Sequence, residues 1–444
     1  MGQGPERYMT GPTRVLSLVD TTAITVGIVI GAGIFSFPGL VAMLLGRPDL
    51  VTVVWIAGGL LSLIGGLCFG ELASAFPDPG GEYHFLHRAY GRDCAFMYGW
   101  ARMTVIQTGS IATLSFVFGD YAQQMASLGP YGPSIYAVLA IVVLTGVNIF
   151  GLRTAKWVQN LLEAGAILGL VILIVVGFSA MGSASTPAAA KPVDPSSLGL
   201  AMVFVMFTYG GWNEAAYISA EVKDGGRNMS RALIYGLGLV TILYVLINVA
   251  YLQALGVEGV AQSRTIGADV MRPVLGEAGA LFMNILIIIV VLTSINVTIL
   301  TGARTSFAMG RDFAPLRFLA QWSEGRAQPV RALQLQGAIS LALVAMGFFS
   351  PDGVKNMVEY LAPVFWLFFL LVGLSLFVLR RREPDAARPF RVPLYPLTPI
   401  IFCLSSAYLL YASLSHYGIH ALAGVVVLLL GLPLLLWIRK AQTS

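Results

Sequence analysis

The feature of this chain that most constrains its fold is a series of apolar stretches, each close to 20 residues long and nearly free of charge. A helix rises 1.5 Å per residue, so about 20 residues cross the hydrocarbon core of a bilayer. Only 11% of the residues are charged, against about 25% in soluble domains. We therefore predict an all-α integral membrane protein with twelve transmembrane helices. The predicted spans are 21–45, 50–70, 97–118, 133–152, 157–181, 197–216, 232–255, 278–303, 332–349, 360–379, 397–415 and 421–438.

The positions of Lys and Arg predict how these spans are oriented. Basic residues accumulate in the cytoplasmic loops of membrane proteins. With twelve spans, Arg47, Lys191, Arg264, Arg272 and Lys355 fall on one side, and the rest of the 27 basic residues fall on the side of both termini. We predict a multi-pass protein of the plasma (inner) membrane with both termini in the cytoplasm. The first stretch is full length and has no cleavage pattern, so we interpret it as a retained span rather than a signal peptide.

Two glycine-rich motifs interrupt predicted spans at bilayer depth. The first is GIVIGAGIF at 27–35, and the second is FTYGGWN at 207–213. Backbone groups released from a helix are tolerated inside a membrane only where they are buried in protein or line a cavity. Paired interruptions in two halves of a transporter mark its binding site. We therefore expect helices 1 and 6 to be discontinuous and to form a site together.

The broken helices offer fixed groups for a ligand that carries both charges. Free N–H groups at the start of a half-helix attract an anion, and free carbonyl groups at its end attract a cation. We expect the amides of 32–34 to bind a carboxylate, and the carbonyls of Val29, Ile30, Phe207 and Gly210 to bind an ammonium group. A zwitterionic α-amino acid matches both. The predicted substrate-binding residues are Val29, Ile30, Gly31, Ala32, Gly33, Ile34, Phe207, Thr208, Tyr209, Gly210 and Gly211.

A packing role is the alternative for these glycines, because small residues let helices approach closely in membranes. We prefer that interpretation for Gly58, Gly59, Gly65 and Gly66 in the second predicted span. For the two motifs we prefer ligand binding, since clustered glycines and neighbouring polar side chains at bilayer depth are hard to explain by packing.

The spacing of the two interrupted spans divides the chain into two halves of five spans and a terminal pair. We place the first repeat at about 16–182, the second at about 197–380, and the terminal helices at about 394–438 of a single transporter domain. In known transporters such halves are inverted repeats, which brings the two broken helices together at the midplane.

The motifs resemble those of the amino acid/polyamine/organocation superfamily, especially its L-type amino acid transporter-like branch. GAGIF resembles the G-[SA]-G-I-F of the first span, and FTYGGWNEAAYISAEVKD resembles the F-x-Y-G-G-W-N and E-x-K-[ND] signature. GELASAFPDPGGEYHFLHRAYG, ARTSFAMGRD and the segment from FWLFFLLVG to RVPLYP are similar to the ends of spans two, eight and ten. The resemblance implies a 5+5 inverted-repeat core plus two helices, and alternating-access transport of amino acids.

Two departures from the family pattern affect binding and coupling. Ala32 stands where much of the family has Ser, so a carboxylate would depend on backbone N–H groups alone. Ala166 stands where family members often have a lysine that is implicated in proton coupling or in linking the broken helix to its neighbour. The nearby Glu163 is a carboxylate within a span, either functional or a protonated structural group. We expect any proton sensitivity to act through Glu163.

Polar residues after the second motif are candidates for a cytoplasmic gate. We expect Asn213, Glu214 and Glu221 to take part in gating or coupling, with ion pairs of the carboxylates and Lys223 as latches. Charges solvated at a helix end are the alternative. Arg102, near one end of span three, is expected to extend its charged head to the membrane interface.

Four further patterns bear on loops and ions. Residues 76–92 begin with a Pro/Gly cluster and continue as an amphipathic stretch, which predicts an interfacial helix. The arginine-rich linker 380–396 is interpreted as a loop that fixes membrane orientation. Hydroxyl groups at 293–301 can contribute to a sodium site, but we prefer bonds to carbonyls of their own helix. The spacing of the three Cys and four His predicts no disulfide, metal or cofactor site.

The expected function is secondary active transport of neutral amino acids, with the substrate held at the unwound parts of helices 1 and 6. The alternatives are an amino acid exchanger or exporter, a polyamine or amine carrier of the same fold, and a non-transporting amino acid sensor. An enzyme would need a nucleophile with a base, or a metal constellation, and ATP-driven transport would need a P-loop; the sequence has none of these. The expected partners are the substrate, the lipid bilayer, and protons or a counter-transported amino acid, but not nucleic acid.

Overall fold

A computed structural model describes residues 16–78, 80–150, 156–180, 194–321, 328–347, 352–416 and 419–443. These residues form helices joined by short connections, apart from isolated bridges such as the one between Leu16 and Val222. The first half contains α1 (Leu18–Val29), η1 (Ala32–Phe35), α2 (Phe37–Leu45), α3 (Pro48–Ala75), α4 (Glu82–Tyr90), α5 (Arg92–Ala101), η2 (Arg102–Ile106), α6 (Gln107–Met125), α7 (Gly132–Ile149) and α8 (Lys156–Ser179). The second half contains α9 (Pro195–Thr208), η3 (Trp212–Glu221), α10 (Gly225–Gln262), α11 (Ile266–Asp312), η4 (Ala314–Ala320), α12 (Val330–Gly347) and α13 (Gly353–Arg382). The chain ends with α14 (Leu397–His416), α15 (Ile419–Leu429) and α16 (Gly431–Thr443).

Within the residues that the structure describes, each predicted span overlaps helical structure. Within the described residues, 8 helices are long and apolar enough to cross a membrane: α3, α7, α10, α11, α12, α13, α14 and the pair α15 and α16. The other predicted spans correspond to shorter apolar helices or to helices interrupted by tighter or wider turns, namely α1 to α2, η2 with α6, α8, and α9 with η3. The chain is therefore an all-helical, multi-pass membrane protein.

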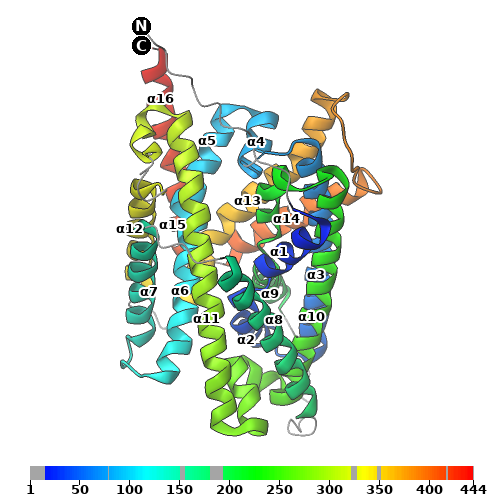
Figure 1. The fold of residues 1–444 in the computed structure, drawn as a ribbon, viewed down its shortest axis with the longest axis vertical. Coiled ribbons are helices and arrows are strands. Elements are labelled where there is room, and N and C mark those ends of the chain that lie inside the picture. The colour runs from blue at the N-terminus through cyan, green and yellow to red at the C-terminus, as the bar shows by residue number, and fades with distance from the viewer. Residues whose placement is uncertain are drawn as a thin grey trace.

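Both predicted discontinuities are present. α1 gives way to the 3-10 turn η1 after two non-helical residues, and α9 gives way to the 3-10 segment η3 after the Gly-Gly pair. In Figure 1, α1 and α9 lie between the long helix α11 on one side and α3 and α10 on the other, and Val29, Ala32 and Phe204 are buried. The breaks therefore lie inside the protein, where released backbone groups are sheltered from lipid.

One end of the bundle carries α4, α5 and α16 (Figure 1), and we call it the α4 end. α4 is the amphipathic helix predicted from the Pro/Gly cluster and the residues that follow it. It is fixed to α13 and the following linker: Arg88 pairs with Glu383 at 2.5 Å, and Arg382 Nη1 donates to the carbonyl oxygen of Ala89 at 2.8 Å.

The glycines of α3 serve helix packing, as predicted. A Cβ at Gly58 would lie 2.3 Å from Val205 of α9, and one at Gly65 would lie 2.6 Å from a ring of η3. At Gly59 and Gly66, a Cβ would lie 2.2 and 2.6 Å from side chains of α10. α3 can therefore pack this closely against the second broken helix only because these positions have no side chain.

The linker after α13 does more than fix orientation, so our interpretation of it was incomplete. Glu71, near the end of α3, is buried, and Arg380 donates to its two carboxylate oxygens at 2.8 and 2.5 Å. The Val392 N–H also donates to Glu71 at 2.6 Å, and Arg388 Nε lies 3.5 Å from it. A buried carboxylate requires such partners because its desolvation is unfavourable. The linker therefore folds over the α4 end of α3.

Replacement of Glu71 by alanine is expected to destabilise the protein by about 3 kcal/mol, because Arg380 and Arg388, whose side chains are 20% and 5% exposed, lose the counter-charge of a buried carboxylate. Asp49→Ala is the control, since it removes an exposed pair with Arg47 and is expected to leave the melting temperature unchanged. Thermal denaturation of the purified proteins in detergent measures both effects. Equal melting temperatures for the two variants would contradict this role of the linker.

Candidate functional site

The two broken helices cross at their breaks. A Cβ at Gly33 would lie 3.1 Å from Cα of Thr208, and one at Gly211 would lie 2.9 Å from the carbonyl oxygen of Ile28. Gly211 also has a φ of 100°, in the left-handed region that favours glycine. Each break thus brings its backbone against the other, and the glycines permit this approach.

The first break releases backbone groups from the helix at the start of its second half. Ile30 (φ −73°, ψ 83°) and Gly31 (φ −115°, ψ −164°) leave the helical conformation, and η1 begins at Ala32. The N–H groups of Ala32 and Gly33 open this turn, so they have no acceptor within it. Ile34 lies further along the turn, and its side chain is fully buried.

The carbonyl group of Val29 does not fit the predicted role of an ammonium ligand. Its oxygen accepts a hydrogen bond from the Gly31 N–H at 2.8 Å and another from the Tyr244 hydroxyl at 2.8 Å. A carbonyl oxygen has two lone pairs, so both are in use. The carbonyl of Phe207 accepts a bond from the Gly210 N–H at 3.1 Å, and the Tyr209 N–H, which bonds to the Val205 carbonyl oxygen at 3.0 Å, is also directed at it. Val29 therefore stabilises the break instead of offering a free acceptor.

The polar side chains at the second break have partners within the protein. The Thr208 hydroxyl donates to the carbonyl oxygen of Phe204 in its own helix at 2.9 Å. The Tyr209 hydroxyl donates to the carbonyl oxygen of Trp55 at 3.0 Å, and its ring packs against Tyr244 with centroids 5.1 Å apart. Tyr209 is fully buried, so its place in the motif is explained by packing among α9, α3 and α10.

A cavity of about 1180 Å³ begins at the crossing and extends to the α4 end. The predicted site residues in its lining are Val29, Ile30, Gly31, Ala32, Gly33, Phe207, Thr208, Gly210 and Gly211. The lining does not include Ile34 or Tyr209, whereas it does include Ala166, the position of the family lysine.

The lining changes from uncharged to charged along the cavity. Around the crossing, the described lining consists of backbone, hydroxyl and apolar groups, and Ser294 Oγ would lie only 3.7 Å from a Cβ at Gly31. Towards the α4 end, the lining includes Glu82, Arg92 and Asp312. The deep part of the cavity is therefore polar without carrying a formal charge on any described side chain.

The hydroxyl groups of α11 bond to their own helix, which confirms the interpretation we preferred. Thr293, Ser294 and Thr298 each donate to the carbonyl oxygen four residues earlier, at 2.9, 3.0 and 2.8 Å. Thr301 donates to the Thr298 carbonyl oxygen at 3.3 Å. Among the residues with defined positions, no group of three or more His, Cys, Asp or Glu side chains could hold a metal ion.

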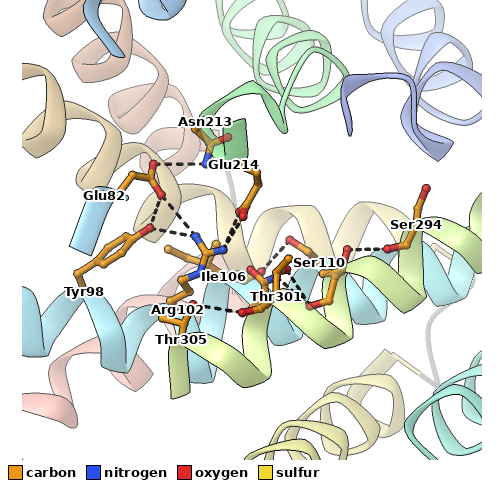
Figure 2. Close-up of polar contacts among 12 residues, drawn as sticks. Glu82, Tyr98, Arg102, Ile106, Ser110, Asn213, Glu214, Ser294, Thr301 and Thr305 are labelled. Atoms are coloured by element: carbon orange, nitrogen blue, oxygen red, sulfur yellow. Dashed lines mark hydrogen bonds and ion pairs between the residues drawn. The ribbon is translucent and has the colours of Figure 1, made fainter. Parts of the chain in front are cut away.

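A buried network of charged and polar side chains joins the second broken helix to α4 (Figure 2). Arg102 Nη2 donates to both carboxylate oxygens of Glu214, at 2.7 and 2.8 Å. Arg102 Nη1 donates to the Tyr98 hydroxyl at 3.1 Å and lies 3.4 Å from Glu82 Oε2. Asn213 Nδ2 donates to Glu82 Oε1 at 3.3 Å, and the Tyr98 hydroxyl also donates to Glu82. All five residues line the cavity.

The prediction that Arg102 extends to the membrane interface is wrong. Its side chain is only 3% exposed, because two carboxylates attract it to the interior. Arg102 opens the π-helical turn η2, and Gln107 follows five residues later. In this turn the Gln107 N–H donates to the Arg102 carbonyl oxygen, and both side chains are buried. Gln107 donates to the carbonyl oxygen of Thr298 at 2.9 Å and to the Thr301 hydroxyl at 2.8 Å.

The charge of Glu82 is only partly compensated within this network. Burial raises the pKa of its carboxyl group, whereas the Arg102 guanidinium and the bonds from Tyr98 and Asn213 lower it. Desolvation has the largest influence on this pKa, and the nearby Glu214 carboxylate raises it further.

The structure describes some of the predicted gating residues and leaves others untested. Asn213 and Glu214 belong to the network, and Lys223 is exposed, in agreement with a solvated charge. The side chains of Glu163 and Glu221 lie outside the described residues, so their roles stay predictions. Sequence reasoning missed the participation of Glu82, Tyr98 and Arg102. The signal available in the sequence was Arg102 itself, an arginine beside an otherwise apolar stretch, which indicates a buried partner of opposite charge.

Comparisons with known proteins agree with this architecture. The chain matches the amino acid permease family over residues 16–425. It is 29% identical over 419 residues to the human b(0,+)-type amino acid transporter 1, covering 92% of this chain and 84% of that protein. It is 27% identical over 438 residues to the serine/threonine exchanger SteT of Bacillus subtilis, covering 98% and 99%. It is 29% identical over 432 residues to the human large neutral amino acids transporter small subunit 2, covering 95% and 79%.

Valine at Gly33 is expected to destabilise the protein by about 1–3 kcal/mol, because its Cβ would press on the Thr208 backbone. Valine at Gly31 is expected to leave the melting temperature near that of the wild type. The φ of −115° suits any residue there, and the Cβ would make an ordinary 3.7 Å contact with Ser294. Thermal denaturation of the two variants measures the difference. A Gly31→Val protein as unstable as Gly33→Val would mean that the two helices do not cross in this way.

Proposed function

This chain belongs to the amino acid permease family of the amino acid/polyamine/organocation superfamily, and we propose that it is a secondary active transporter of neutral amino acids. The family and the relatives are transporters and not enzymes. The observation that carries the proposal is the crossing of two broken helices at the deep, uncharged end of one cavity. Such a crossing presents amide donors and carbonyl acceptors to one ligand.

The backbone at the crossing fits the two charged groups of an amino acid. In our proposal, the N–H groups of Ala32 and Gly33 bind the carboxylate. The carbonyl groups of Ile30, Phe207 and Gly210 bind the ammonium group, while Val29 is excluded because Gly31 and Tyr244 occupy it. Hydrogen bonds to charged groups are stronger than those between neutral groups, so few contacts suffice.

The lining next to the crossing favours a substrate with a neutral side chain. The space left for the side chain lies among α6, α8 and α11, where Ser110, Ala166 and Ser294 line the cavity. A charged side chain there would be desolvated without a counter-charge among the described residues, which is unfavourable. We propose a small or apolar side chain, with hydroxyl groups available as hydrogen-bond partners.

The direction of the cavity supports an inward-facing state in which η3 is still docked on Arg102. We propose that the α4 end is cytoplasmic, because Arg88, Arg311 and Arg380 lie there and basic residues favour the cytoplasm. On the opposite side of the crossing the helices are packed, since a Cβ at Gly39 would lie 3.0 Å from the carbonyl oxygen of Ser263. We further propose that 16–182 and 197–380 are inverted repeats, with 394–438 as a terminal helix pair.

Exchange against a second amino acid is a second candidate for the driving force. Ala166 lines the cavity at the position where we expect many family members to have a lysine, and an alanine there cannot carry a proton. One relative is an exchanger by name. Proton coupling through Glu163 stays a prediction, which the pH profile of a Glu163→Gln variant tests.

The purified protein is expected to be stabilised by a neutral L-amino acid but not by the corresponding methyl ester or decarboxylated amine, since each of these lacks the carboxylate. A ligand at 100 times its Kd stabilises the folded state by about 2.7 kcal/mol. A thermal-shift screen of the twenty amino acids, followed by esters and amines of those that bind, measures this. An ester or amine that stabilises as well as its parent amino acid would contradict the proposed site.

Gly31→Val is expected to abolish uptake of the identified amino acid, because the side chain fills space beside Ser294 that the substrate needs. The control is Gly238→Val, at a described position where a Cβ would meet no atom within 4 Å, and it is expected to retain uptake. Radiolabelled uptake into proteoliposomes, with and without internal amino acid, measures activity and separates exchange from net transport. Wild-type uptake by Gly31→Val would contradict a substrate site at Gly31.

A further inference from the structure

Two carboxylates share the guanidinium of Arg102, and they share it unequally. Arg102 makes a bidentate contact with Glu214 at 2.7 and 2.8 Å, whereas Glu82 lies 3.4 Å away. The Glu82 carboxylate is completed by bonds from Tyr98 and Asn213. The Arg102 guanidinium thus has Glu214 as its close partner and Glu82 as a second carboxylate nearby.

The two carboxylates belong to different parts of the structure. Glu214 and Asn213 lie on η3, directly after the second break. Arg102 lies on the continuous helix from α5 to α6, and Glu82 lies on α4, which is fixed to α13 and its linker (Figure 2). Movement of η3 away from α5 and η2 would remove Glu214 and Asn213 together, and would leave Arg102 and Glu82 facing each other.

The network lies between the crossing and the α4 end of the cavity. Arg102 is about 12 Å along its helix from Ser110, at 1.5 Å per residue. The lining continues beyond Arg102 to Asp312 at the α4 end. A substrate that travels from the crossing to that end therefore passes the contact between Arg102 and η3.

We propose that Arg102 is a partner-exchange gate: it holds Glu214 while η3 is docked, and it pairs with Glu82 when η3 moves away. This inference rests on the proposed transport function and adds the residue that controls the movement of the second broken helix. A buried charge that loses its close counter-charge is strongly destabilised. Because Glu82 is ready to replace Glu214, Arg102 keeps a counter-charge in both positions, and the barrier to opening is lowered.

The Glu214 carboxylate, once released from Arg102, also has a favourable environment. The Glu214 side chain is 24% exposed while it is docked, whereas the Arg102 and Glu82 side chains are each 3% exposed. Glu214 can therefore be hydrated after release, which the two buried groups cannot. Glu82 gains by the exchange, because it then receives the full contact with Arg102.

The test compares two substitutions that a purely structural role would not separate. Glu214→Gln removes the docked partner, so Arg102 is expected to pair with Glu82 and η3 to be released. Glu82→Gln removes the second partner, so η3 is expected to stay docked. Opening is measured as the labelling rate of a cysteine introduced at Val297, which lines the cavity, by a water-soluble maleimide. Relative to Val297→Cys alone, we expect at least about threefold faster labelling with Glu214→Gln and threefold slower labelling with Glu82→Gln.

Asp93→Asn is the matched control, because it removes an exposed ion pair with Arg439 at the same end of the bundle that the proposed gate does not use. It is expected to leave the labelling rate unchanged. Each proposed variant leaves Arg102 with one carboxylate in the docked state, so both are expected to fold, which size-exclusion chromatography and melting temperature check. Background labelling of Cys68, Cys94 and Cys403 is measured on protein without Val297→Cys.

Shifts in the same direction for Glu214→Gln and Glu82→Gln, or no shift in either, would overturn the gate. Amino acid binding supplies the second readout: Glu82→Gln is expected to bind within about threefold of the wild type while its turnover falls at least about tenfold. Equal turnover of Glu82→Gln and wild type would also contradict the proposal. The labelling assay needs no substrate, so opposite labelling shifts without amino acid binding would refute the proposed function and leave the gate intact.

Discussion

The structure depends on one constraint, which is that backbone N–H and C=O groups inside a membrane need partners in the protein or in a cavity it encloses. Two helices are interrupted inside the protein, and neighbouring groups bond to some of the backbone atoms that the interruptions release. The Tyr244 hydroxyl and the Gly31 N–H saturate the carbonyl of Val29, and the Gly210 N–H takes one lone pair of Phe207. What stays open faces the deep end of the cavity. In our proposal these open groups form the substrate site, so a bound amino acid supplies the hydrogen-bond partners that the broken helices lack.

The walls of the cavity are fixed by side chains that bond to backbone groups of neighbouring helices. Gln107 and Gln336 donate to the carbonyl oxygens of Thr298 and Ile299 in α11, at 2.9 Å each. These bonds join α6 and α12 to α11 and make that wall rigid. The contact between η3 and Arg102 is different, because it is made by side-chain charges with an alternative arrangement available. The molecule therefore combines a fixed wall with a broken helix that our proposal allows to move.

Several features of the fold could be predicted from the sequence because they depend on local patterns. The apolar stretches predicted the helices, the glycine clusters predicted both breaks, and the small residues of α3 predicted its close packing. Other features depend on contacts between distant positions. Arg102 meets Glu214, 112 residues later in the chain, and Glu71 meets Arg380, 309 residues later. Hydropathy and spacing carry no information about such pairs, so Arg102 was predicted to reach the interface and the linker to be a simple loop. The loss of Val29 as a free acceptor likewise required the position of Tyr244, which lies on another helix.

The most direct test of the central claim is a cryo-electron microscopy map of the purified protein at a saturating concentration of a neutral amino acid that it binds. The account predicts density for one amino acid between the two breaks, with its carboxylate at the N–H groups of Ala32 and Gly33 and its ammonium group towards the carbonyls of Ile30, Phe207 and Gly210. A bound amino acid elsewhere in the cavity, with the crossing empty, would contradict it.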